Sequence, residues 1–145
     1  MRLWHQKLIP YLPRQQLLGL HRECCALRGA GWSRKHATVD YVFTHLPERL
    51  VAYHWLVMDE MERRGYHPDS AWDKGSYRGK KLGYQENWVD EDIADTWHNL
   101  PEGKMIYAEH DTAYLIECIE NLKDKGVMLP PIEEIIERNG WMEVK

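Results

Sequence analysis

The sequence predicts an all-α fold, a compact single-domain helical bundle with a long basic and aromatic loop and extra helices toward the carboxyl end. In several segments apolar residues recur every three to four positions, the period of an amphipathic helix, and little of the chain alternates as a half-buried strand would. A chain of 145 residues is also long enough to bury a real core but short for two domains of ordinary size.

The first predicted helix runs from Pro13 to Gly31. Proline suits the first turn of a helix, where its missing N–H would have no partner, and the glycines near residue 30 suit a helix end. A helix of about four turns with one buried face is therefore expected. Its apolar stripe consists of Leu17, Leu20, Cys24 and Leu27.

Arg22 and Glu23 place a base beside an acid on this helix. Glu23 falls at the edge of the apolar stripe and Arg22 well round from it, which predicts a half-buried carboxylate within reach of the positively charged amino terminus. The competing interpretation is a solvated ion pair at a helix edge, because charged residues on helices are usually exposed.

A short apolar arm precedes this helix and a longer helix follows it. A proline prevents a long helix within residues 1–12, which are expected to pack down on the protein. The longer helix is expected to be capped by Thr44, to have Pro47 in its first turn and to stop at Gly65. Apolar residues cover most of its circumference, which predicts the central helix, with His54 as an ordinary core or edge histidine.

Residues 67–88 lose the helical periodicity and are predicted to form a long loop. Basic residues alternate there with aromatic rings, a composition typical of a surface that follows a nucleic-acid strand. A mobile connector is the alternative. The basic residues are Lys74, Arg78, Lys80 and Lys81, and the rings are Trp72, Tyr77, Tyr84 and Trp88.

The carboxyl-terminal part is predicted to be helical. A short helix is expected from Asp90, ended at Pro101, followed by a clear one between a capping Asp111 and a terminating Gly126, and a last one with Pro131 near its start. The expected organisation is one domain, residues 1–145, with a core at 1–66, the loop at 67–88 and an acidic helical part at 89–145.

The net charge of −4 hides an asymmetry between the two parts of the chain. Residues 1–85 carry 14 Lys and Arg against 8 Asp and Glu, whereas residues 86–145 carry 5 against 15. A basic part of this kind favours a polyanionic partner such as nucleic acid. Arg34, Lys35 and His36 add three donors suited to phosphate oxygens, with a solvated charge cluster as the alternative.

Several classes of protein lack their signatures in this chain. No apolar run approaches the ~20 residues that cross a bilayer and no signal-peptide pattern is visible, so a cytoplasmic protein without a membrane partner is expected. The three cysteines have no CxxC spacing, which predicts buried free thiols. The motifs of common nucleotide-binding proteins, zinc proteases and serine hydrolases are absent. The spacing of a metal site is not recognised in His21, His36 and Asp40. Neither a metal nor a cofactor is therefore expected.

The amino-terminal part resembles the pyrimidine-dimer DNA glycosylase family of the phage endonuclease V type. The resemblance covers residues 1–66: an apolar arm, Leu17 and the pair Arg22 and Glu23, the basic triplet at 34–36, and a long helix that closes as ERRGY. It implies a compact all-helical fold and a glycosylase with coupled abasic-site lyase activity. The implied substrate is damaged double-stranded DNA, and no metal or cofactor is needed.

The resemblance also implies a site. In this family an unprotonated α-amine attacks C1′ of the damaged nucleotide and leaves a Schiff base, while a carboxylate stabilises the developing positive sugar. It therefore assigns Met1, Glu23 and Arg22 to catalysis, with Arg22 on a phosphate or the distorted strand. The DNA-binding residues expected from the resemblance and from the basic loop are Arg2, His21, Arg34, Lys35, His36, Lys74, Arg78, Lys80 and Lys81.

The sequence departs from the family pattern at three places. Ala26 stands where the family has a further arginine, so a phosphate contact is either absent or moved to Arg28. The acidic carboxyl end has Trp141 as a lone ring in place of the family's aromatic-rich tail. Arg2 should block removal of the initiator residue, so the nucleophile is expected to be the α-amine of Met1 itself.

Other readings stay open on the sequence. A non-catalytic nucleic-acid-binding module would keep the basic face without the chemistry, and a protein-interaction domain would use the acidic carboxyl half. Within the enzyme, Lys7 or Lys35 could replace the α-amine if burial lowered its pKa. A monomer that acts at the nucleoid is favoured, and the lesion is not specified.

Overall fold

The computed structural model describes residues 3–29, 40–84, 90–98 and 104–137. Within these ranges the chain is helical, and the only strand-like pairing is an isolated bridge between Tyr77 and Tyr84. The predicted all-α fold class is confirmed. The elements, in chain order, are the 3-10 helix η1 (Gln6–Tyr11), α1 (Arg14–Arg28), the 3-10 helix η3 (Asp40–Phe43), α2 (Pro47–Arg63), the 3-10 helix η4 (Ser70–Asp73), α3 (Asp90–His98), α4 (Thr112–Asp124) and α5 (Ile132–Glu137).

Helix α1 begins where the sequence predicts and buries the predicted stripe. Pro13 lies directly before it in an extended conformation, and its carbonyl accepts the N–H of Leu17 at 2.9 Å. At the other end the N–H of Gly29 donates to the carbonyl of Cys25 at 2.9 Å. Local spacing therefore determines this helix. The stripe residues Leu17, Leu20, Cys24 and Leu27 are all buried.

Helix α2 is the central helix, as predicted. It packs on α1, its side chains are buried on nearly every side, and His54 is fully buried. Pro47 is its first residue, but the predicted cap is wrong. The hydroxyl of Thr44 donates to the carbonyl of Tyr41 at 2.9 Å, inside its own turn, and α2 follows Leu46 with no side-chain cap.

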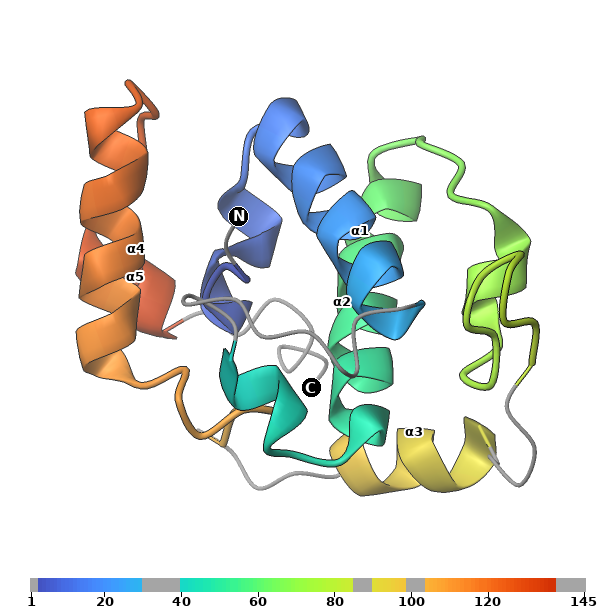
Figure 1. Ribbon diagram of the computed structural model, residues 1–145. Coiled ribbons are helices and arrows are strands. Elements are labelled where there is room, and N and C mark those ends of the chain that lie inside the picture. Colours follow the sequence, from blue (N-terminus) through green and yellow to red (C-terminus); the bar gives the residue numbers. More distant parts are fainter. Residues whose placement is uncertain (1–2, 30–39, 85–89, 99–103, 138–145) are drawn as a thin grey trace.

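The amino-terminal arm and the carboxyl-terminal helices lie on one side of the α1–α2 pair, as Figure 1 shows. Helix η1 packs against α2 and α5, and Nζ of Lys7 donates to the carbonyl of Ile136 at 2.7 Å. Helix α4 has the predicted cap, because the Asp111 side chain accepts the N–H of Tyr114, and α5 begins directly after Pro131. Helix α3 packs against α2.

One hydrophobic cluster runs through these elements, from Leu3 in the arm to Ile135 in α5. It joins residues on both sides of the boundaries predicted near residues 66 and 88, which supports the proposal that residues 1–145 form one domain. The predicted loop contains η4 and a tight turn closed by the isolated bridge. Among the described residues, no helix combines the length and apolar character needed to cross a bilayer.

Candidate active site

Glu23 lies in the second half of α1 and is buried more deeply than the sequence predicts. Only 4 % of it is exposed, whereas Arg22 is exposed and its guanidinium lies near Gly19. Adjacent helical side chains point about 100° apart, so the two charges face different surroundings. The sequence predicted a half-buried carboxylate, and the structure corrects the degree of burial. Helical spacing alone does not take account of the other parts of the chain that cover the edge of the stripe.

The amino-terminal arm is bound to the central helix α2. Leu3 and Trp4 are buried, and the carbonyl of Trp4 accepts a hydrogen bond from the hydroxyl of Tyr53 on α2. Burial, and next the nearby thiol of Cys24, raise the pKa of Tyr53 well above its ordinary value. Tyr53 therefore binds the arm to α2 at a point near Cys24, the neighbour of Glu23 on α1.

The second half of the chain holds this arm by hydrogen bonds. Tyr114 on α4 donates its hydroxyl hydrogen to the carbonyl of Leu3 at 2.7 Å. The N–H of Gln6 donates to Nδ1 of His110 at 3.1 Å, and the side-chain oxygen of Gln6 accepts the N–H of Ile106 at 2.9 Å. These partners are 100 to 111 residues apart, so no local sequence pattern could have predicted them.

His110 is the centre of this anchorage. Because its Nδ1 accepts the N–H of Gln6, its Nε2 carries the hydrogen and donates to the hydroxyl of Tyr41 at 2.7 Å. Burial first, and the adjacent His5 second, lower the pKa of His110 well below its ordinary value, so the ring is neutral near pH 7. His5 and Tyr114 stack on it, with centroid distances of 5.2 and 5.3 Å.

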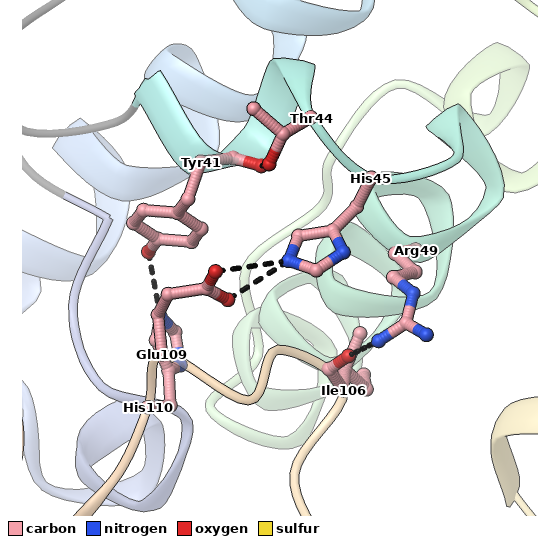
Figure 2. A network of polar contacts seen from close by, with 7 residues as sticks. All are labelled: Tyr41, Thr44, His45, Arg49, Ile106, Glu109 and His110. Carbon is pink, nitrogen blue, oxygen red and sulfur yellow. Dashed lines mark hydrogen bonds and ion pairs between the residues drawn. The ribbon is translucent and has the colours of Figure 1, made fainter.

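Figure 2 shows how residues 106–110 are fixed to the beginning of α2. Arg49 donates to the carbonyl of Ile106 at 2.7 Å, and Nε2 of His45 lies 2.9 Å from a carboxylate oxygen of Glu109. The arm is thus supported by a segment that is itself bound to the central helix.

A second polar cluster joins His21 and Cys25 on α1 to His54 on α2. Nη1 of Arg28 lies 3.0 Å from Nδ1 of His54, and Nε2 of His54 lies 2.9 Å from Nδ1 of His21. A guanidinium can only donate, so His54 carries its hydrogen on Nε2 and donates to His21. His21 then carries its own hydrogen on Nε2, which faces Sγ of Cys25 at 3.7 Å. Burial lowers the pKa of both histidines, so both rings are neutral near pH 7.

The same side chains have the spacing of a metal site, because ligand atoms of His21, Cys25 and His54 lie within 4.8 Å of one another. The hydrogen-bond directions oppose this use. A metal bound at Nε2 of His54 would displace the hydrogen from that nitrogen. Nδ1 of His54 carries no hydrogen either, because it accepts from Arg28, so the ring would have to be an imidazolate anion. Burial also raises the pKa of Cys25 to about 11, so its thiol is protonated near pH 7 in the metal-free protein. The cluster is better explained as a hydrogen-bonded link between the two central helices.

Arg28 is buried and binds the polypeptide backbone. It is 1 % exposed, and its guanidinium donates to the carbonyls of Trp72, Lys74, Gly75 and Tyr77 at 2.7 to 3.2 Å. Burial lowers its pKa to about 10, which leaves it charged near pH 7. The alternative that a phosphate contact had moved to Arg28 is therefore wrong, because the guanidinium already donates to four backbone carbonyls.

The predicted DNA-binding residues of the loop are of two kinds. Lys74, Lys80 and Lys81 are exposed. Arg78 is half-buried, and its Nε and Nη2 donate to the carbonyls of the last residue of α1 and of the glycine after it, at 3.0 and 3.1 Å. Burial lowers its pKa. Arg78 thus attaches the loop to the end of α1, a structural role that the sequence did not predict.

The ERRGY segment that closes α2 has a packing role. Arg64 donates to the buried carboxylate of Glu60 at 2.6 Å and to the carbonyl of Pro10 at 3.1 Å. The guanidinium of Arg14 lies over the ring of Tyr66, 5.6 Å from its centroid. These contacts join the end of α2 to the arm and to the start of α1, so the segment supports the site from a distance.

Some predicted site residues lie outside the described part of the chain. They are Met1, Arg2, Arg34, Lys35 and His36, and the side chain of Asp40 is likewise not described. Of the cysteines, Cys24 and Cys118 are buried free thiols as predicted, whereas Cys25 is half-buried.

A family model described as pyrimidine dimer DNA glycosylase matches residues 1–74, about half of the chain. The match includes the arm, α1, α2 and η4, and with them Arg22 and Glu23. No curated protein and no solved structure matches the chain.

Proposed function

The chain belongs to the pyrimidine dimer DNA glycosylase family, as its sequence pattern predicts, and we propose from this premise that it releases a damaged base from duplex DNA and cleaves the strand at the abasic site. The observation that carries the proposal is Glu23, a carboxylate buried in α1 beside Cys24, whose thiol lies near the tyrosine that holds the amino-terminal arm. Buried carboxylates beside a nucleophile serve as charge stabilisers and proton acceptors in active sites.

The nucleophile in this proposal is the α-amine of Met1. An α-amino group has a pKa of about 8, so a usable fraction is neutral near pH 7, whereas a lysine amine has a pKa of about 10.4. Only two residues separate the amine from the anchored Leu3, a reach of about 7 Å. Lys7 is a weaker candidate, because its Nζ donates to the carbonyl of Ile136 on α5.

The proposed reaction has two stages. The amine nitrogen bonds to C1′ of the damaged nucleotide, the bond from C1′ to the base breaks, and the base leaves with the bonding electron pair and gains a proton. The amine loses a proton, its lone pair forms the C=N bond of a Schiff base as the bond from C1′ to the ring oxygen breaks, and that oxygen takes the bonding electron pair and a proton. Removal of a C2′ proton then expels the 3′ phosphate by β-elimination, and water releases the product from the amine.

Glu23 would act on the reacting sugar and Arg22 on the strand. The carboxylate would stabilise the positive charge that develops at C1′ and then assist the proton transfers of ring opening and elimination. Such stabilisation is stronger in a site from which water is excluded, and Glu23 is buried. Arg22 is exposed on α1, where a guanidinium could hold a phosphate in a bidentate contact.

The other DNA contacts are assigned to basic side chains outside the reacting centre. His21 is neutral, its Nδ1 accepts from His54 and its Nε2 hydrogen faces Sγ of Cys25, so it would contribute to a DNA contact only this Nε2 hydrogen and no charge. Arg78 would act by holding the loop in place. The substrate would be damaged double-stranded DNA, bound by a monomer without a metal or a cofactor. Phosphate contacts are assigned to Arg2, Arg34, Lys35, His36, Lys74, Lys80 and Lys81.

Borohydride trapping tests this function. Incubation with an abasic-site duplex and sodium borohydride should give a covalent protein–DNA adduct, because borohydride reduces a Schiff base to a stable amine. Mass spectrometry should locate the bond at the α-amine of Met1, and acetylation of that amine should abolish the adduct. An adduct on a lysine would move the mechanism to another amine. Binding with neither adduct nor cleavage would favour the rival function, a non-catalytic nucleic-acid-binding module.

A further inference from the structure

Residues 77–84 form a tight turn with a fixed shape, here called the basic hairpin. The N–H of Arg78 donates to the carbonyl of Gly83 at 2.7 Å, and the N–H of Gly83 donates to the carbonyl of Gly79 at 2.8 Å. Gly79 and Gly83 have φ of 99° and 66°, a conformation that glycine adopts without strain. In Figure 1 the segment lies on the side of the α1–α2 pair opposite α4 and α5.

The root of the basic hairpin is bound to the carboxyl end of α1. Arg28 donates to the carbonyl of Tyr77 at 3.0 Å, and Arg78 donates back to the carbonyl of Arg28 at 3.0 Å. The ring of Trp72 packs against that of Tyr77 with centroids 4.7 Å apart. A helix rises about 1.5 Å per residue, so this root lies roughly 8 Å along α1 from Glu23, comparable to two or three base-pair steps of about 3.4 Å.

The tip combines positive charge with exposed apolar surface. Lys80 and Lys81 are exposed, and so are 49 % of Leu82 and 57 % of Tyr84. Residues 74–84 contain four basic residues and no acidic one. This combination suits nucleic acid, because its phosphates pair with lysine and its bases offer apolar faces.

We infer that the basic hairpin enters a groove of the damaged duplex, with Leu82 inserted into the base stack two or three steps from the lesion and Lys80 and Lys81 on the flanking phosphates. The inference rests on the proposed function, since it requires a DNA substrate. Proteins that kink DNA commonly insert an apolar side chain between base steps, and unstacking costs least where the stack is already damaged. The lysines would thus bind any duplex, while Leu82 would favour a damaged one.

The other exposed apolar side chains do not fit this role. Ile116 and Ile136 lie on α4 and α5, in the part of the chain that carries 15 acidic and 5 basic residues, and Met128 lies between the two helices. Phosphates would be repelled there. Met128, which is 93 % exposed, is therefore a matched control for removing apolar surface elsewhere on the protein.

The test uses a duplex with a non-cleavable abasic analogue and, two or three steps from it, 2-aminopurine, an adenine analogue whose fluorescence rises when it is unstacked. Wild-type protein at saturation should raise the fluorescence. Leu82→Ala should reduce this rise, and the preference for damaged over undamaged duplex, by about five- to ten-fold. Leu82→Met should retain both, because it keeps an apolar side chain of similar size. Met128→Ala should behave as wild type, and melting temperatures should show all variants folded.

The lysines should give the complementary result. Replacing Lys80 and Lys81 together by Ala should weaken binding of damaged and undamaged duplex equally, reduce the slope of log affinity against log salt by about 2, and leave the fluorescence rise at saturation intact. A full fluorescence rise with Leu82→Ala would overturn the inference. Borohydride adducts from the same wild-type protein would then show that the proposed function survives, whereas wild-type protein that neither binds nor forms an adduct would overturn both.

Discussion

Arg22 and Glu23 are neighbours in the sequence, yet one is exposed and the other buried. Their opposite charges can be read directly from the sequence, and the angle between the two side chains follows from helical spacing. It could not predict how deeply Glu23 lies, because other elements cover that edge of α1. The difference in burial is what separates a group suited to the reacting sugar from one suited to the strand.

Glu23→Gln removes the charge and nearly keeps the shape. We expect single-turnover cleavage of an abasic duplex to fall by about 10²- to 10⁴-fold, the usual contribution of general acid–base catalysis, with DNA affinity and melting temperature little changed. Arg22→Gln on the exposed side is the matched control and should weaken DNA binding more than cleavage at saturating protein. Cleavage by Glu23→Gln at the normal rate would reduce Glu23 to a structural carboxylate.

The buried histidines make the free energy of unfolding depend on pH. Burial lowers the pKa of His5 from 6.5 to about 4, and those of His54 and His110 in the same direction. Below pH 6.5 the unfolded chain binds protons at these rings and the native chain does not, so stability is full above pH 6.5 and falls as the pH drops toward 4. Each histidine contributes up to about 1.4 kcal/mol per pH unit.

Urea unfolding between about pH 7 and pH 5 measures this dependence. His5→Asn should show a shallower fall, because it removes one of the titrating rings while its side-chain oxygen can still accept the N–H of Lys7. Equal pH dependence in both proteins would mean that His5 does not contribute.

The two central helices follow from local pattern, but the path of the loop does not. Apolar spacing, together with proline and glycine at the ends, predicted α1 and α2 correctly. The loop is organised by Arg28, whose acceptors lie 44 to 49 residues further along the chain. In the sequence this arginine has the appearance of a surface charge, since only the folded backbone brings its acceptors together.

Arg28→Met should therefore destabilise the protein by about 3 kcal/mol or more, because it leaves buried carbonyls without a donor. Equilibrium urea unfolding checks this value. Arg22→Met, an exposed arginine on the same helix, is the control and should change stability by no more than about 0.5 kcal/mol. Equal effects of the two substitutions would contradict the internal role of Arg28.

Across the whole molecule, the family match ends at residue 74, yet the arm is held by residues 106–114. The charge asymmetry between residues 1–85 and residues 86–145 is visible in the sequence, and it would keep DNA on the basic side of the molecule. It could not predict the anchorage, because hydrogen bonds between residues at least 100 positions apart leave no periodic signal. In the proposed mechanism the acidic part would therefore act without contacting DNA, by supporting the segment that carries the proposed nucleophile.

Tyr114→Phe tests this support, because it deletes the donor to the carbonyl of Leu3 and keeps the ring that stacks on His110. We expect borohydride trapping at saturating DNA to slow by about ten-fold, since a loosely held arm presents the amine less often in the geometry of attack. DNA affinity and the pH dependence set by the amine should stay unchanged, which a general loss of structure would not allow. The lost hydrogen bond should cost only about 1 kcal/mol of stability.

Tyr66→Phe, at the half-buried tyrosine after α2, is the control for removing a hydroxyl. An unchanged trapping rate would mean that α4 serves the fold alone and that the hydrogen bond from Tyr53 and the burial of Leu3 and Trp4 are enough to position the arm.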